Sequence, residues 1–168
     1  HRNYRYYWMG GAVSVLGFWL HKLALGWLTW DLTHSPLWLG IIGFSATFVT
    51  AVIAPFAGAV ADRFGLRKTA FIALSCSSAN AMAIAIITIN GAMKVELLVI
   101  LTLVQGITLS FDLPARQALV HHIVDREDLS AAIALNTTTF HVGAFIGPAL
   151  FGVVTSIWDI PAAFFINS

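Results

Sequence analysis

A short charged stretch between two long apolar runs holds the side chains best suited to charge-based chemistry. It extends from Gly58 to Lys68 and places one carboxylate, Asp62, among three cationic side chains. A carboxylate at a helix end can accept charge-assisted hydrogen bonds, including bonds from the N–H groups that begin a neighbouring helix. Gly65 can adopt the positive φ that a tight chain reversal requires. The stretch therefore predicts a tight polar turn whose candidate residues are Gly58, Asp62, Arg63, Gly65, Arg67 and Lys68.

Lys22 is the only basic residue deep within an apolar run. Around it, steps of three and four residues produce a stripe of small and polar side chains on one helix face. A charge at the centre of a bilayer costs about 2.5 to 3.5 kcal/mol on insertion scales and is usually turned away from lipid. We therefore expect Lys22 to face a central cavity and to contact either an anionic substrate or a carboxylate from a part of the protein outside residues 1–168. Snorkelling to the interface is the alternative. The candidate cavity residues are Lys22, Ser14 and Thr29 on the first helix, with Thr102 and Gln105 on the fourth.

Enzymatic and metal chemistry have little support in the sequence. No Ser, His and Asp set and no phosphate-binding glycine loop is present. His121 and His122 are adjacent and would point about 100° apart on a helix, so they do not form a metal site. His21 and His141 are interpreted as hydrogen-bonded packing residues. We expect no enzymatic activity, no metal and no cofactor.

The composition is that of a membrane protein. Hydrophobic residues make up 58% of the 168, the mean hydropathy is +0.82 and only 10% of residues are charged, whereas soluble domains carry about 25% charged residues. The net charge of +1 excludes a basic surface for nucleic acid. Cys76 is the only cysteine, which excludes a disulfide framework and a thiolate metal site.

The apolar runs predict five complete spanning helices and the start of a sixth. The fourth helix should end around Asp112 to Pro114, followed by a short amphipathic segment that reaches Val124. Because the chain starts with His1 and its last apolar run is short, we expect residues 1–168 to be an N-terminal helix bundle cut within helix 6. The expected spans are 8–31, 36–61, 69–90, 96 to about 112–114, 129–157 and the start of a helix at 162–168.

The distribution of basic residues predicts the orientation. Seven of the nine basic residues fall on the side of the N-terminus, and only Lys94 falls in a loop on the other side. Short cytoplasmic loops carry the excess of Lys and Arg, so the N-terminus should be cytoplasmic.

Helices 2 and 5 each carry a proline followed by a glycine in their second half, which is the pattern expected of an inverted repeat. In helix 5, small residues would let a neighbouring backbone approach closely, while proline bends the axis. These helix 5 residues are Gly143, Gly147, Pro148 and Gly152.

The charged turn resembles the loop between helices 2 and 3 of the major facilitator superfamily, with Val60 and Leu66 as departures. The glycines and proline of helix 5 resemble the antiporter pattern of that superfamily. Asp112 to Arg116, at the cytoplasmic end of helix 4, and Ala24 to Trp27 resemble bacterial exporters similar to the enterobactin exporter. The resemblance covers essentially all of the chain.

This resemblance implies the N-terminal half of a twelve-helix secondary transporter in the bacterial plasma (inner) membrane. It further implies that the charged turn latches two halves together, and that the partners are the lipid bilayer, a small organic substrate and the C-terminal half. Proton-coupled export of a drug or siderophore is the expected activity. Thr102 stands where antiporters often have an arginine, so the proton-coupling residue is left open, as is the substrate. The alternatives are an importer or symporter on the same scaffold, and a membrane subunit without transport activity.

Overall fold

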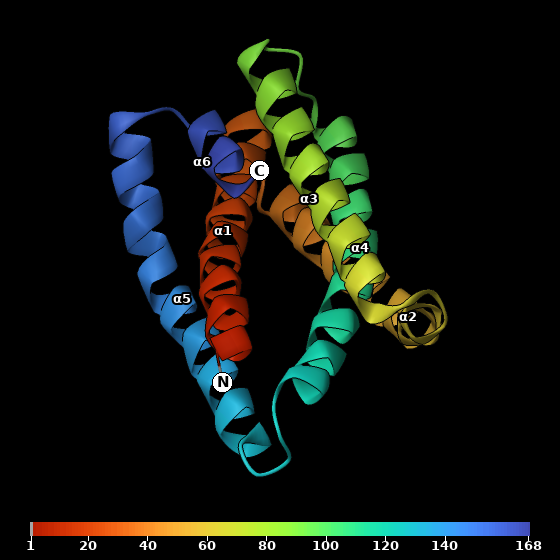
Figure 1. Cartoon of the computed structure of the whole chain (residues 1–168). Helices are drawn as coiled ribbons and strands as arrows, with labels where there is room; N and C mark the ends of the chain where they lie inside the picture. The colour runs from red at the N-terminus through yellow and green to blue at the C-terminus, as the bar shows by residue number, and fades with distance from the viewer. Residues whose placement is uncertain (1) are drawn as a thin grey trace.

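The computed structural model describes the backbone of residues 2–168 and the side chains from Tyr4 onwards. All regular structure in this part of the chain is helical. The helices are α1 (Arg2–Thr33), α2 (Pro36–Phe64), α3 (Leu66–Ile89), α4 (Val95–Ile123), α5 (Leu129–Ile157) and the short α6 (Pro161–Asn167), arranged as in Figure 1.

Helices α1 to α5 are long and apolar enough to cross a membrane. The shortest, α3, has 24 residues, and about 20 suffice to cross the hydrocarbon core. The sixth helix, α6, has seven residues. The predicted all-α membrane bundle is confirmed, with five helices of spanning length and a short sixth, and the chain is a multi-pass membrane protein.

The turn between α2 and α3 is shorter than the sequence predicted. We expected a non-helical turn from about Ala61 to Thr69, but Gly65 is the only residue between the two helices. Its φ of +97° lies in the region that residues with a Cβ rarely adopt. The Gly65 N–H still donates to the Ala61 carbonyl at 3.0 Å, so α2 keeps its helical bonding up to the reversal.

The predicted end of the fourth helix near Pro114 is wrong. Helix α4 continues through the proline to Ile123. Proline removes one helical hydrogen bond, and membrane helices tolerate this where neighbouring groups support the turn. That support comes from an ion pair between Asp112 and Arg116, which lie on either side of Pro114. The hydroxyl of Tyr7 on α1 also donates to the Arg116 carbonyl.

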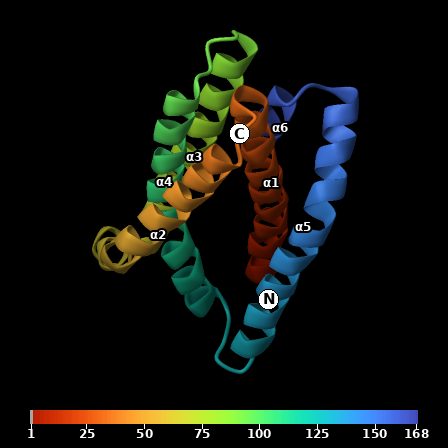
Figure 2. The ribbon, with the colours of Figure 1, turned by 180° about the vertical axis from the view of Figure 1, so that it is seen from behind.

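The first three helices and the last three pack in matching ways. Helix α2 packs most extensively on α4, and α5 lies along α1; α3 packs on α4, and α6 on α1. Figures 1 and 2 show α1 and α4 running in opposite directions, with α5 beside α1 on one side and α2 and α3 beside α4 on the other. This is the arrangement of an inverted repeat, in which α1, α2 and α3 correspond to α4, α5 and α6.

The larger buried core lies at one end of the bundle only. It gathers Leu28 of α1, Ile42 of α2, Ile84 of α3, Leu98 of α4 and Phe164 of α6. A smaller apolar cluster around Val120, Val124 and Ala132 lies at the opposite end, where Tyr4 and Tyr7 of α1 pack against it.

Candidate substrate site

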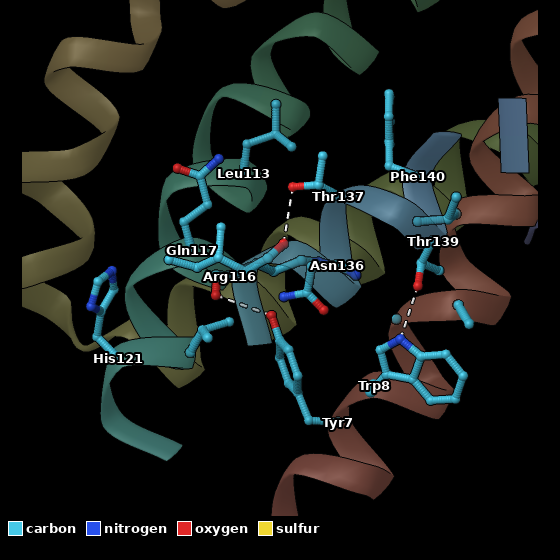
Figure 3. A pocket seen from close by; sticks show the side chains of 15 residues that line it. Tyr7, Trp8, Leu113, Arg116, Gln117, His121, Asn136, Thr137, Thr139 and Phe140 are labelled. Carbon is cyan, nitrogen blue, oxygen red and sulfur yellow. Dashed lines mark hydrogen bonds between the residues drawn. The ribbon is translucent and has the colours of Figure 1, made fainter. Parts of the chain in front are cut away.

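A cavity of about 590 Å³ lies between α1, α4 and α5 at the end of the bundle that holds the N-terminus. All of its walls come from the first half of α1, the last third of α4 and the first half of α5. Figure 3 shows aromatic, amide and hydroxyl side chains around it. The residues that the argument uses are Tyr7, Trp8, Gly11, Ala12 and Val15 of α1, Arg116 and Gln117 of α4, and Asn136, Thr139 and Phe140 of α5.

One face of α1 forms the first wall. Trp8, Gly11 and Val15 follow steps of three and four residues, which place them on the same side of a helix. Lys22 lies seven residues beyond Val15 and so continues this face toward the middle of the bundle. Its side chain is exposed, and its Nζ lies 5.0 Å from the centre of the Trp19 ring, within the range of a cation–π contact.

Arg116 organises the α4 wall. Its Nε donates to an Asp112 carboxylate oxygen at 2.7 Å, and its Nη2 donates to the Ser14 hydroxyl on α1 at 3.1 Å. The Tyr7 hydroxyl donates to the Arg116 carbonyl at 3.0 Å, a bond visible in Figure 3. Helix α4 is thus tied to α1 at two points, Tyr7 and Ser14.

Two side chains of α1 tie α5 to the same site. The Trp8 indole N–H donates to the Thr139 hydroxyl at 2.9 Å, as Figure 3 shows. The Tyr4 hydroxyl lies 3.0 Å from the Ala132 carbonyl and 3.2 Å from the Asn136 side-chain oxygen. These bonds also explain why α1 begins at Arg2 and not near Trp8 as predicted, because they anchor its first two turns.

An aromatic cluster around Phe140 borders the inner end of the cavity. The Phe140 ring lies 5.4 Å from Trp19 and 6.1 Å from Phe18, measured between ring centres. Trp19 can pack closely against α5 because Gly143 and Gly147 of that helix have no side chain at the contact. A Cβ on Gly143 would lie 2.5 Å from Val15 Cγ1, and one on Gly147 would lie 2.8 Å from Trp19 Cβ.

The whole chain matches one family of membrane proteins. The family described as transmembrane secretion effector matches residues 1–168. The chain belongs to this family of the major facilitator superfamily.

Curated relatives in the superfamily are transporters by name. The staphyloferrin A transporter of Staphylococcus aureus is 24% identical over 95% of this chain and 41% of its own length. The MFS-type transporter YfiS of Bacillus subtilis, itself uncharacterized, is 27% identical over 94% of this chain and 37% of its own. A protein named as a candidate multidrug resistance protein, MdtD of Klebsiella pneumoniae, is 30% identical over 92% of this chain and 33% of its own. The chain therefore spans about two fifths or less of the length of these relatives, and no solved structure matches it.

In this major facilitator chain, none of the five predicted cavity residues is among those that line the cavity. Ser14 reaches Arg116 at the cavity, and Lys22 lies on the same face of α1. Thr29 and Thr102 are buried, and their hydroxyls donate to carbonyls of their own helices, at Leu25 and Leu98.

Gln105 turns toward α3 instead. Its amide nitrogen donates to the Ser77 hydroxyl at 2.9 Å, and its oxygen accepts from Asn80 Nδ2 at 3.1 Å. Asn80 Nδ2 also donates to the Leu101 carbonyl. In this conformation Gln105 belongs to a clamp between α3 and α4.

The residues of the charged turn lie at the surface. Asp62, Arg63, Arg67 and Lys68 are all exposed, and none of them has an ion-pair partner within the described part of the chain. Gly58 is half-buried and has open space where a Cβ would lie. On α5, Pro148 is exposed and Gly152 likewise has nothing within 4 Å of a Cβ, unlike Gly143 and Gly147.

Sequence reasoning missed most of the cavity wall. It gave no role in the cavity to Tyr7, Trp8, Asn136 or Thr139. The sequence did contain one signal for the α1 wall. Trp8, Gly11 and Val15 are spaced three and four residues apart, on the same helix face as Lys22. Which residues of α4 and α5 meet this stripe depends on helix packing and has no sequence signal of its own.

Proposed function

We propose that the chain forms the N-terminal bundle of a secondary transporter that exports a small organic molecule, such as a drug or a siderophore, in exchange for protons. In alternating access, two bundles rock about a central site that opens to one side of the membrane at a time. The C-terminal half of the same transporter would supply the other wall of that site. The membership of the family and the names of the relatives support this proposal.

The observation that carries the proposal is the cavity between α1, α4 and α5. Its volume of about 590 Å³ is within the range of small-molecule pockets, roughly 300–1,000 Å³. Its wall combines the rings of Trp8 and Phe140 with the amide of Asn136 and the hydroxyl of Thr139. Apolar surface with a few polar groups is what orients small organic ligands.

The proposed orientation supports export as the direction of transport. Basic residues lie at the end of the bundle that holds the N-terminus, and Lys94 lies at the other end, which favours a cytoplasmic N-terminus in a bacterial inner membrane. The cavity then faces the cytoplasm, while the buried core around Leu28 and Leu98 closes the outer end. An exporter would load its substrate from this state, whereas an importer would release its substrate from it, so the direction rests on the names of the relatives.

Within this scheme Ser14 and Lys22 would contact a substrate that extends beyond the cavity, because Ser14 binds the cavity residue Arg116 and Lys22 continues the face of α1 that carries Val15. Thr29, Thr102 and Gln105 would reach the path only after the helices rearrange. The charged turn would latch the two halves in another state, with the exposed Asp62 carboxylate accepting hydrogen bonds from the C-terminal half.

The test compares a cavity residue with its sequence neighbour. Ala12 lines the cavity, whereas Val13 is 71% exposed and does not. Cells that express the full-length protein should retain less ethidium or staphyloferrin A than cells without it. Ala12→Phe should abolish this difference, because the ring fills the cavity, and Val13→Phe should preserve it.

The outcomes separate the alternatives. Energy-dependent uptake of a probe in place of efflux would favour an importer or symporter. Unchanged retention of both probes, with the protein correctly inserted, would favour a membrane subunit without transport activity. Equal effects of Ala12→Phe and Val13→Phe would contradict the assignment of the cavity.

A further inference from the structure

A second groove lies outside the proposed transport path, where α2 and α3 diverge from the turn at Gly65. These two helices have few contacts with each other, and α4 forms the floor between them. The groove has a volume of about 390 Å³. Its walls are almost entirely apolar and include Phe64 of α2, Ile72 and Cys76 of α3, and Ile107 and Phe111 of α4.

Lys68 is the only charged residue among those that line this groove. It lies at the end of the groove nearest the turn, two helical turns before Cys76, or ~12 Å along the α3 axis. The Lys68 side chain is exposed and has no ion-pair partner within the described residues. The groove is thus apolar along its length and cationic at one end.

The position of the groove restricts its occupant. Its walls belong to membrane-spanning helices, and Ile72 and Ile107 remain 61% and 42% exposed. A void of this size beside hydrocarbon would forfeit the dispersion contacts of its lining atoms, so a flexible chain should fill it. The end at Lys68 lies where α3 begins, at the level of the membrane interface, where lipid headgroups are found.

We propose that this groove binds one phospholipid with a net negative headgroup, with an acyl chain along α3 and the phosphate beside Lys68. The charges of the turn are complementary to such a headgroup, because Arg63, Arg67 and Lys68 together outnumber the single carboxylate, Asp62. The unpaired N–H groups at the start of α3 add positive potential at the same place. This inference does not depend on the direction of transport or on its substrate.

The test uses the full-length protein solubilised from membranes that contain equal amounts of phosphatidylglycerol and phosphatidylcholine with identical acyl chains. Native mass spectrometry counts the lipids that remain bound. We expect one phosphatidylglycerol to be retained in preference to phosphatidylcholine. Lys68→Ala should reduce this preference about fivefold, the equivalent of roughly 1 kcal/mol for one basic side chain near the membrane surface. Lys68→Arg should preserve it.

Two matched variants separate the groove from general electrostatic attraction. Lys94→Ala removes an exposed lysine that does not line this groove and should leave the preference unchanged. Cys76→Trp should fill the groove and reduce the number of retained lipids, although the charges stay the same. Ile86→Trp, at an exposed position on the same helix and outside the groove, should not.

Three results would overturn the proposal. Equal retention of the two lipids by the unaltered protein would exclude selection by charge. A preference that survives Lys68→Ala would exclude Lys68 as the headgroup contact. Retention that survives Cys76→Trp would mean that the lipid binds elsewhere or that another part of the protein covers the groove.

Discussion

Arg116 and Asp112 bind each other across Pro114, with the guanidinium Nε 2.7 Å from a carboxylate oxygen. The two side chains lie one turn apart on α4 and are mostly buried, with 25% and 13% of their surface exposed. They hold together the turn that the proline weakens. Through Ser14, Arg116 also connects α4 to α1 beside the cavity.

This ion pair should be measurable by a double-mutant cycle. Asp112→Asn and Arg116→Gln should each lower the free energy of unfolding, because each leaves the other side chain as a partly buried charge without its partner. The loss in the double variant should be about 1 to 2 kcal/mol smaller than the sum of the two single losses. Reversible unfolding in mixed micelles is the measurement. A parallel cycle at the exposed Lys94 and Glu96, which lie two residues apart and do not face each other on a helix, should show additivity. Additivity at Asp112 and Arg116 as well would contradict the role of the pair.

The glycines of α5 should differ sharply in their tolerance of alanine. Gly147→Ala should lower the free energy of unfolding by about 1 to 3 kcal/mol, because its Cβ would lie 2.8 Å from the Trp19 Cβ and force α1 and α5 apart. Gly152→Ala should be neutral or slightly stabilising, since nothing lies within 4 Å of its Cβ. The two thermal unfolding curves in detergent give the comparison. Equal destabilisation by both variants would mean that α1 and α5 do not pack as described.

The clamp between α3 and α4 should respond to single and double substitutions in opposite ways. Asn80→Leu should cost about 1 to 3 kcal/mol, because Gln105 then loses its buried donor. Adding Gln105→Leu should recover part of that loss, since two apolar partners leave no unsatisfied group between them. The measurement is the unfolding of Asn80→Leu, Gln105→Leu and the double variant in mixed micelles. A double variant less stable than either single variant would refute the clamp.

The exposed carboxylate of the charged turn should matter for transport and not for insertion. Asp62→Asn keeps the shape of the side chain but weakens its hydrogen bonds to cationic or helix N-terminal donors, so efflux by the full-length protein should fall to background. Asp159→Asn, in a loop at the other end of the bundle, should transport normally. The measurement is probe efflux at matched protein levels in the membrane. Normal efflux with Asp62→Asn would exclude a role of the Asp62 carboxylate in transport. The charged turn would then serve only to fix the orientation of the helices in the membrane.

Lys22 should be reached by water through the cavity. In a background without Cys76, Lys22→Cys should react with a water-soluble thiol reagent added from the cytoplasmic side, and bound substrate should slow this reaction. Val13→Cys, exposed on another face of α1, should show no protection by substrate. A cysteine at position 22 that is never labelled from either side, together with normal efflux by Lys22→Leu, would exclude the cavity role and favour snorkelling.

The sequence by itself determined the class of protein, the number of spans and the place of the reversal at Gly65. These properties are local. The length of an apolar run decides whether a helix crosses the bilayer, and the absence of a Cβ decides which residue can take a φ of +97°. The family was also recognisable from short motifs, because the charged turn and the glycines of α5 are contiguous in the chain.

Only the tertiary structure decided which helices meet and where each polar side chain points. Helices that face lipid on one side and apolar neighbours on the other carry no strong apolar stripe. The sequence therefore does not show that Gln105 points toward Asn80, or that Arg116 points toward Ser14.

The end of α4 was mispredicted for a related reason. Proline is a local signal for a helix end, but contacts with distant segments also act on the helix: Tyr7, which is 109 residues away in the chain, donates to the Arg116 carbonyl just beyond Pro114. The cavity exists because α1, α4 and α5 separate at one end, and shape complementarity between distant segments controls that separation.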